Sequence, residues 1–340
     1  MKKLLNILYV QTQGTYLRRE GETVVAERER EVVSRIPIHT LSGIVCFGNV
    51  LCSPFLLGLC AEHGVHVSFL SEHGRFLARI EGGVSGNVLL RVAQMQKSLD
   101  KAKACELAIS FVAGKILNAR TILMRRLRDH GSDSTCESVA LRLATLIQHL
   151  RQADTTDAVR GVEGEAAACY FEAFNSLLIA QREQFSIPGR NRRPPLDPMN
   201  SLLSFLYTLL SHDCIGALES VGLDPQIGFL HTLRPGRPSL ALDLMEEFRS
   251  PLADRMAISL VNLQQLTPKC FRKTESGAVE MTDDARKTVL MAWQKKKQEK
   301  LIHPFLNEKV EIGLLPYVQA MLLARHLRGD LDAYPPFILK

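Results

Sequence analysis

The stretch KSLDKAKACELAISFVAGKILNARTILMRRLRDHG, from Lys97 to Gly131, is where the pattern of the chain changes. Its apolar residues recur near the helical spacing, and it ends in basic residues before a glycine. Basic residues near the end of a helix interact favourably with the helix dipole. The stretch therefore predicts a long helix. The sequence before it has the pattern of strands, and the sequence after it has the pattern of helices.

Residues 1 to about 95 have the pattern of short strands. The segment NILYVQTQGTYLRREGETVVAERERE alternates charged residues with valine and is broken at Gly14 and Gly21. SGIVCFG, VHVSFLSEHG and RFLARIEGG predict further strands, and a short helix is expected from about Ser53 to Glu62. Gly82, Gly83 and Gly86 then cluster before the period changes.

The chain after Lys97 reads as helical. Helices are predicted at 135–153, 163–183, 199–221 and 243–263, with a basic helix at 286–300 and an amphipathic helix near the end. We therefore predict an α+β fold, with a β-rich domain over 1–88, a linker over 89–98 and a larger α-helical domain over 99–340. At 340 residues the chain is long enough for two domains.

The composition is that of an ordinary globular protein, with 46% apolar and 23% charged residues. A net charge of +6 permits a polyanionic partner without requiring one. The 8 cysteines never form a C-x-x-C pair, which favours free thiols in a reducing compartment. We expect no apolar stretch to approach the roughly 20 residues of a membrane span, and therefore a cytoplasmic protein with no membrane contact.

One candidate acid is Glu163, in the segment GVEGEAAACYFEAF. We expect it in the first turn of a helix, beside Gly161 and Gly164, where glycine allows a ligand to approach closely. A carboxylate in that position also has a purely structural explanation, because it stabilises a helix N-terminus through the dipole.

A second group of candidates lies in VGLDPQIGFLHTLRPGRPSLALDLMEEFRSPLADR, from Val221 to Arg255. His231 precedes a Pro-Gly turn, and the next helix is expected to start with Asp243, Glu246 and Glu247. Each has a structural alternative, as a hydrogen-bonded core histidine or as N-terminal helix charge. Together, one imidazole and two or more carboxylates suit Mn²⁺ or Mg²⁺, which could polarise a phosphodiester and activate water or a 3′-hydroxyl.

Arginines flank these elements, several of them in the proline-rich loop GRNRRPPLDPMN at 189–200. Such runs are usually solvated surface, but here they also suit a track for DNA phosphates. The candidate DNA-binding residues are Arg190, Arg192, Arg193, Arg234, Arg237 and Arg249.

Four segments carry a resemblance: RGVEGEAAACYF, RNRRPPLDPMNSLLSFLYTLL, GLDPQIGFLHTLRPGRPSLALDLMEEFRSPLADR and LRGDLDAYPPF. They resemble the CRISPR-associated integrase family, the catalytic subunit of the spacer-acquisition complex, and are closest to its subtype I-C branch. The resemblance runs essentially end to end. It implies an N-terminal β-sandwich-like domain followed by an all-helical C-terminal domain.

The resemblance also implies a function. A homodimer would assemble with a small ferredoxin-fold partner and hold double-stranded DNA. The activity implied is metal-dependent endonuclease and integrase chemistry, in which a prespacer 3′-hydroxyl attacks a phosphodiester at the border of a CRISPR repeat. Two alternatives stay open, a stand-alone structure-specific nuclease acting on branched DNA and a non-catalytic DNA-binding scaffold. The second is disfavoured because every expected metal-liganding side chain is present.

The family's site residues carry over one by one. The implied metal ligands are Glu163, His231 and Glu246, with Glu247 as an alternative third ligand. Asp243 matches a second family acid that supports the site, and it is expected among the catalytic residues with Glu163, His231 and Glu246. Asn200 and Tyr207 match positions near the site.

Overall fold

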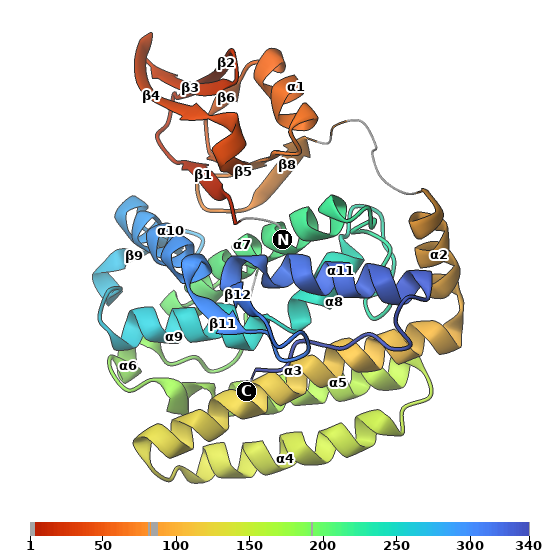
Figure 1. Cartoon of the computed structure of the whole chain (residues 1–340). Coiled ribbons are helices and arrows are strands. Elements are labelled where there is room, and N and C mark those ends of the chain that lie inside the picture. Colours follow the sequence, from red (N-terminus) through yellow and green to blue (C-terminus); the bar gives the residue numbers. More distant parts are fainter. Residues whose placement is uncertain (1–3, 81, 83–87, 192, 340) are drawn as a thin grey trace. The chain divides into compact units, whose positions relative to one another are not determined.

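The structure is a computed structural model (Figure 1). It describes residues 4–80, 82, 88–191 and 193–339. The chain divides into two compact units, Met1–Gly86 with Leu290–Glu299, and Asn87–Val289 with Lys300–Lys340. Arg192 and part of the predicted glycine cluster lie outside the described residues.

Two four-stranded sheets make up most of the first unit. In the first sheet, with order β1-β5-β7-β8, the first three strands are parallel and the last is antiparallel. The second sheet has order β4-β3-β2-β6 and is antiparallel except for the β2–β6 pair. The strands are β1 (Asn6–Val10), β2 (Tyr16–Glu20), β3 (Thr23–Arg28), β4 (Glu31–Pro37), β5 (Leu41–Phe47), β6 (Leu51–Cys52), β7 (His66–Leu70) and β8 (Phe76–Ile80).

One hydrophobic core serves both sheets and helix α1 (Pro54–Glu62). Leu17, Ile44 and Leu56 represent the two sheets and the helix in this core, and none of the three is exposed to solvent. The predicted short helix is confirmed, and the Ser53 hydroxyl caps it by accepting a hydrogen bond from the Leu56 N–H at 3.2 Å.

The second unit is rich in helices. Among them α3, α4 and α5 pack side by side, and α7 packs against α8 and α11 (Figure 1). The mixed α+β class is therefore confirmed. The helices are α2 (Val88–Leu99), α3 (Lys101–His130), α4 (Ser134–Arg151), α5 (Thr156–Glu172), α6 (Arg182–Phe185), α7 (Pro198–Ser220), α8 (Ser239–Glu246), α9 (Arg255–Asn262), α10 (Asp283–Gln298) and α11 (Leu315–Arg328). The first residues of α10 belong to this unit, and those from Leu290 on belong to the first.

The expectation of an all-helical C-terminal domain is wrong. Two antiparallel hairpins interrupt the helices, β9 (Phe271–Lys273) with β10 (Val279–Met281), and β11 (Lys300–Ile302) with β12 (Lys309–Glu311). Strands of three residues are too short to produce a clear alternation in the sequence.

The segment 89–98, expected as a linker, is part of helix α2. Leu90 and Gln94 lie one turn apart on its buried face, and the helix packs against α3 and α11. Several apolar residues of α2, such as Leu89, Val92 and Met95, are exposed, so the apolar pattern of the sequence does not mark the face that this helix buries.

Two helices, α3 and α7, are long and apolar enough to cross a membrane by composition, with mean hydropathies of 1.4 and 1.3 in their most apolar windows. The expectation that no segment approaches this length was therefore wrong. However, 56% of each window is buried inside the protein. Core helices pass the same test, so this is weak evidence for a span.

Candidate metal-binding and catalytic site

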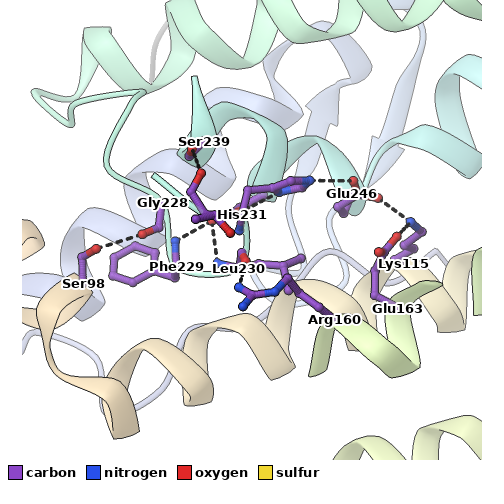
Figure 2. A network of polar contacts seen from close by, with 12 residues as sticks. Ser98, Lys115, Arg160, Glu163, Gly228, Phe229, Leu230, His231, Ser239 and Glu246 are labelled. Carbon is purple, nitrogen blue, oxygen red and sulfur yellow. Dashed lines mark hydrogen bonds and ion pairs between the residues drawn. The ribbon is translucent and has the colours of Figure 1, made fainter. Parts of the chain in front are cut away.

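Four elements of the second unit bring charged side chains together (Figure 2). Helix α3 contributes Lys115 and α5 contributes Glu163. The loop before α8 contributes His231, and α8 itself contributes Asp243 and Glu246. The predicted acids and the histidine therefore do lie in one region.

Glu163 does not lie where the sequence predicted. Helix α5 begins at Thr156, and the Thr155 hydroxyl caps it by accepting from the Ala158 N–H at 3.3 Å. Glu163 is consequently about two turns into the helix, and the explanation that it stabilises a helix N-terminus is wrong. Its carboxylate instead forms an ion pair with the Lys115 ammonium.

Asp243 is a fully buried anchor for the loop that carries His231. Its Oδ2 accepts hydrogen bonds from the N–H groups of Phe229 at 2.6 Å and Leu230 at 3.0 Å. Its Oδ1 accepts from the His231 N–H at 2.9 Å and lies 2.6 Å from the ring Nδ1. A carboxylate accepts, so this contact places a proton on Nδ1, and in the neutral imidazole the lone pair is then on Nε2.

The loop before α8 is held at several points. An added Cβ on Gly228 would come within 2.8 Å of Asp243 Oδ2, so only glycine allows this approach. Ser98 Oγ on α2 donates to the Gly228 carbonyl, and Arg160 Nη1 on α5 donates to the Leu230 carbonyl, each at 2.9 Å (Figure 2). The direction of the His231 ring therefore depends on three helices.

Glu246 lies at the end of α8 and is almost fully buried. Burial alone would raise the pKa of its carboxyl, but Arg249, Lys115 and His231 outweigh burial and lower the pKa to about 2. Arg249 Nη2 lies 2.9 Å from Oε1 and Lys115 Nζ lies 2.8 Å from Oε2. The carboxylate is charged at neutral pH. Because α8 begins at Ser239, helix N-terminal charge does not explain this acid either.

Glu247 faces a different part of the protein. Its carboxylate accepts from the Tyr334 hydroxyl at 2.6 Å, the Phe337 N–H at 2.7 Å and the Gln319 Nε2 at 2.9 Å. Complete burial, only partly offset by these hydrogen bonds, raises its pKa to about 8. These contacts tie Glu247 to the C-terminal segment, so the geometry favours Glu246 over Glu247 as a third ligand.

The donor set suits a divalent cation, although the spacing is not that of a formed site. Among the described residues, no three His, Cys, Asp or Glu side chains stand together at metal-binding distances. His231 Nε2 lies 3.9 Å from Glu246 Oε1, and Lys115 lies between Glu163 and Glu246. Glu246 Oε2 is buried and has no well-directed hydrogen bond. Two carboxylates and an oriented imidazole fit Mg²⁺ or Mn²⁺.

Tyr207 and Asn200, predicted near the site, contact residues at its edge. The guanidinium groups of Arg190 and Arg249 lie 5.2 and 4.9 Å from the centre of the Tyr207 ring, and the Tyr207 hydroxyl donates to Asp254 Oδ1 at 2.7 Å. Asn200 is fully buried and donates to the Gly189 carbonyl at 3.0 Å. It thereby fixes the start of the proline-rich loop to α7.

The candidate DNA-binding arginines differ in their surroundings. Arg190 and Arg249 turn inward, since Arg190 hydrogen-bonds Asn200 and Ser204 while Arg249 pairs with Glu246. By contrast, Arg193 and Arg234 are exposed, and Arg237 is half-buried.

Three contributors to the site were not among the predicted site residues: Lys115, Arg160 and Asp254. Lys115 lies in the middle of helix α3, which was predicted from the spacing of its apolar residues. Its acid partners are 48 and 131 residues away along the chain, so no local spacing could have identified its role.

The CRISPR associated protein Cas1 family matches residues 8–295 of the chain. The chain belongs to this family. CRISPR-associated endonuclease Cas1 1 of Chlorobaculum tepidum is 54% identical over 341 residues, covering 99% of each chain. CRISPR-associated endonuclease Cas1 2 of Rhodospirillum rubrum is 52% identical over 347 residues, covering all of both chains.

Solved structures share the Cas1 fold at low sequence identity. A CAS1 protein from Thermotoga maritima has a TM-score of 0.83 at 24% identity, covering 96% of this chain and 97% of that one. A casposase bound to its integration product has a TM-score of 0.84 at 22% identity, with coverage of 99% and 95%. A Cas6-RT-Cas1–Cas2 complex gives 0.85 at 22%, covering all of this chain and 37% of that one. These likenesses concern the fold alone.

Proposed function

We propose that this member of the Cas1 family is a metal-dependent DNA endonuclease and integrase of CRISPR adaptation. It would insert spacer DNA into the repeat array by attack of a 3′-hydroxyl on a phosphodiester. The observation that carries the proposal is that Lys115 joins Glu163 to Glu246 while His231 Nε2 lies 3.9 Å from Glu246. The imidazole is held by buried Asp243. Curated relatives above 50% identity are named endonucleases.

The proposed roles of the side chains follow from their contacts. Glu163, Glu246 and Nε2 of His231 would hold Mg²⁺ or Mn²⁺, which as a Lewis acid would polarise the attacked phosphodiester. Asp243 keeps the proton on Nδ1, so that Nε2 stays available as a donor to the metal. Arg249 compensates the buried charge of Glu246 and is itself held against Tyr207.

The proposal extends to partners and place of action. The first unit would form a homodimer, and the chain would assemble with a small ferredoxin-fold partner on double-stranded prespacer and repeat DNA in the cytoplasm. A Cas1–Cas2 complex with the same fold supports the partner. The assignment to the subtype I-C branch rests on the sequence segments quoted above.

The test combines the chain, its small partner, a supercoiled plasmid carrying the repeat, and labelled duplex DNA. Glu163→Ala, His231→Ala and Glu246→Ala should each abolish Mg²⁺- or Mn²⁺-dependent cleavage and joining, because each removes one metal ligand. Circular dichroism should show an intact fold for Glu163→Ala and His231→Ala, whose side chains are partly exposed. Glu246→Ala leaves the buried charges of Arg249 and Lys115 without a partner and should also lower stability.

The matched control is Glu165→Ala, an exposed acid on the same helix as Glu163, which should retain activity. Full activity in His231→Ala would reject the site. Cleavage of branched DNA without the partner and without any joining would instead favour the stand-alone nuclease.

A further inference from the structure

Lys115 has contacts that the proposed chemistry does not explain. Its ammonium forms an ion pair with Oε1 of Glu163 and lies 2.8 Å from Oε2 of Glu246. The side chain is only 15% exposed. Figure 2 shows it reaching from α3 to the two carboxylates. A single positive charge therefore joins two acids from different helices.

Glu163 and Glu246 are the two carboxylates proposed to hold the divalent cation, and Lys115 contacts one oxygen of each. The other oxygen of Glu246 is already paired with Arg249 at 2.9 Å, and the Nδ1 of His231 is committed to Asp243. An ammonium and a divalent cation repel each other and compete for the same lone pairs. Both cannot keep full contact with Glu163 and Glu246 at once.

The two cations beside Glu246 differ in how firmly they are held. The Arg249 guanidinium is planar and lies 4.9 Å from the centre of the Tyr207 ring, which fixes its position. Lys115 carries its charge on a flexible four-carbon chain, which can swing the ammonium away from both acids. Lys115 is thus the cation that can leave.

We infer that Lys115 is a resident counter-cation, a positioning residue that holds Glu163 and Glu246 together and gives way when the divalent metal binds. The inference rests on the proposed metal site. Once displaced, the ammonium remains beside the metal, where a phosphate oxygen of the DNA is a suitable new partner for a lysine point charge.

The first experiment measures Mn²⁺ binding to the full-length chain by electron paramagnetic resonance, without DNA. Lys115→Met keeps the length of the side chain but removes the competing charge. It should bind Mn²⁺ at least tenfold more tightly than the wild type. Its melting temperature should fall in a metal chelator, where the two acids repel each other, and should rise more on adding Mn²⁺. Lys103→Met, an exposed lysine of the same helix, is the matched control and should leave the affinity unchanged.

A second experiment uses the wild-type chain, so that the test does not depend on the folding of the variant. An amine-acylating reagent and mass spectrometry report the accessibility of the Lys115 ammonium. Acylation of Lys115 should increase when Mn²⁺ is added, relative to Lys103. Unchanged or decreased acylation would overturn the inference.

The outcomes separate this inference from the proposed function. Wild-type chain that binds Mn²⁺, with Lys115→Met binding no more tightly, would reject the counter-cation and leave the metal site standing. Absence of Mn²⁺ binding in both proteins would reject the metal site, and the inference with it.

Discussion

At the scale of single residues, Glu246 and Glu247 show that the environment decides the charge of an acid. They are adjacent and both buried, yet the pKa is lowered to about 2 in one and raised to about 8 in the other. Glu246 lies among three cationic or protonatable side chains. The hydrogen-bond donors to Glu247 in the described part of the chain are neutral. Adjacent residues on a helix point in different directions. Here one acid meets cationic side chains and the other meets neutral hydrogen-bond donors.

Asp254 offers a pH test at the same scale. Burial raises the pKa of its carboxyl from 3.8 to about 6, despite the Tyr207 hydrogen bond and the nearby charges of Arg249 and Arg190. Between these two pH values the folded state binds more protons than the unfolded state, so stability falls as pH rises. The loss is complete above about pH 6 and amounts to about 3 kcal/mol at most.

Asp254→Asn removes this titration. The stability of the variant relative to the wild type should therefore increase as pH rises from 4 to 7, as measured by urea unfolding. The control is Asp129→Asn, at the exposed end of α3, where Arg128 lowers the pKa of the acid. A stability difference for Asp254→Asn that stays constant across this range would contradict the raised pKa.

At the scale of elements, helix α2 was predicted to be a linker, but it supports the loop that carries His231. Gln94 is fully buried, and its Nε2 donates to the carbonyls of Asp224 and Ile227, each at 2.8 Å. Its Oε1 accepts from the Asp224 N–H at 3.0 Å. One glutamine thus satisfies three backbone groups at the start of the loop that leads to His231.

Gln94→Leu should therefore destabilise the chain and weaken DNA cleavage together. Leaving buried backbone groups without partners costs about 1–3 kcal/mol each, although water can reach some of them after relaxation. Thermal unfolding and the plasmid assay measure the two effects. Gln96→Leu, an exposed position on the same helix, is the control and should change neither. Wild-type behaviour of Gln94→Leu in both assays would show that α2 does not support the loop.

The helical pattern of the sequence predicted most elements but not their ends. The predicted helix at 199–221 matches α7, whereas the one at 243–263 is α8 and α9 separated by a π-helical segment, Arg249–Asp254. Pro251 lies in that segment and lacks the N–H that a regular helix uses. Apolar periodicity continues through such a break because the same face stays buried.

The sequence predicted which residues belong to the candidate site, but it did not predict most of the contacts between them. The family resemblance supplied Glu163, His231, Asp243 and Glu246, and the short separation of His231 from Asp243 made their contact accessible to local reasoning. The long-range partners were not accessible in this way, because packing of distant helices brings them together. The pairing of Lys115 with Glu246 and the attachment of the C-terminal segment to Glu247 are examples.

At the scale of the whole molecule, the net charge of +6 says little about where DNA would bind. Part of that positive charge is directed inward, since Arg190 and Arg249 take part in contacts around Tyr207. Elsewhere it is paired on the surface, as in Arg128 with Asp129 and Arg142 with Glu172. The exposed arginines near the site therefore indicate where DNA phosphates would bind better than the net charge does.

Arg193 and Arg234 give the last prediction, because both are exposed and belong to the two loops that adjoin the site. Each phosphate contact on duplex DNA contributes about −0.9 to the slope of log K against log salt concentration. The double variant Arg193→Ala/Arg234→Ala should flatten the slope by up to about 2 units, and affinity should fall equally for all DNA sequences, because phosphate contacts carry no sequence information. Arg128→Ala/Arg142→Ala removes the same charge from arginines already paired with acids and should leave the slope unchanged. Equal flattening in both double variants would mean that net charge, and not these two loops, governs DNA binding.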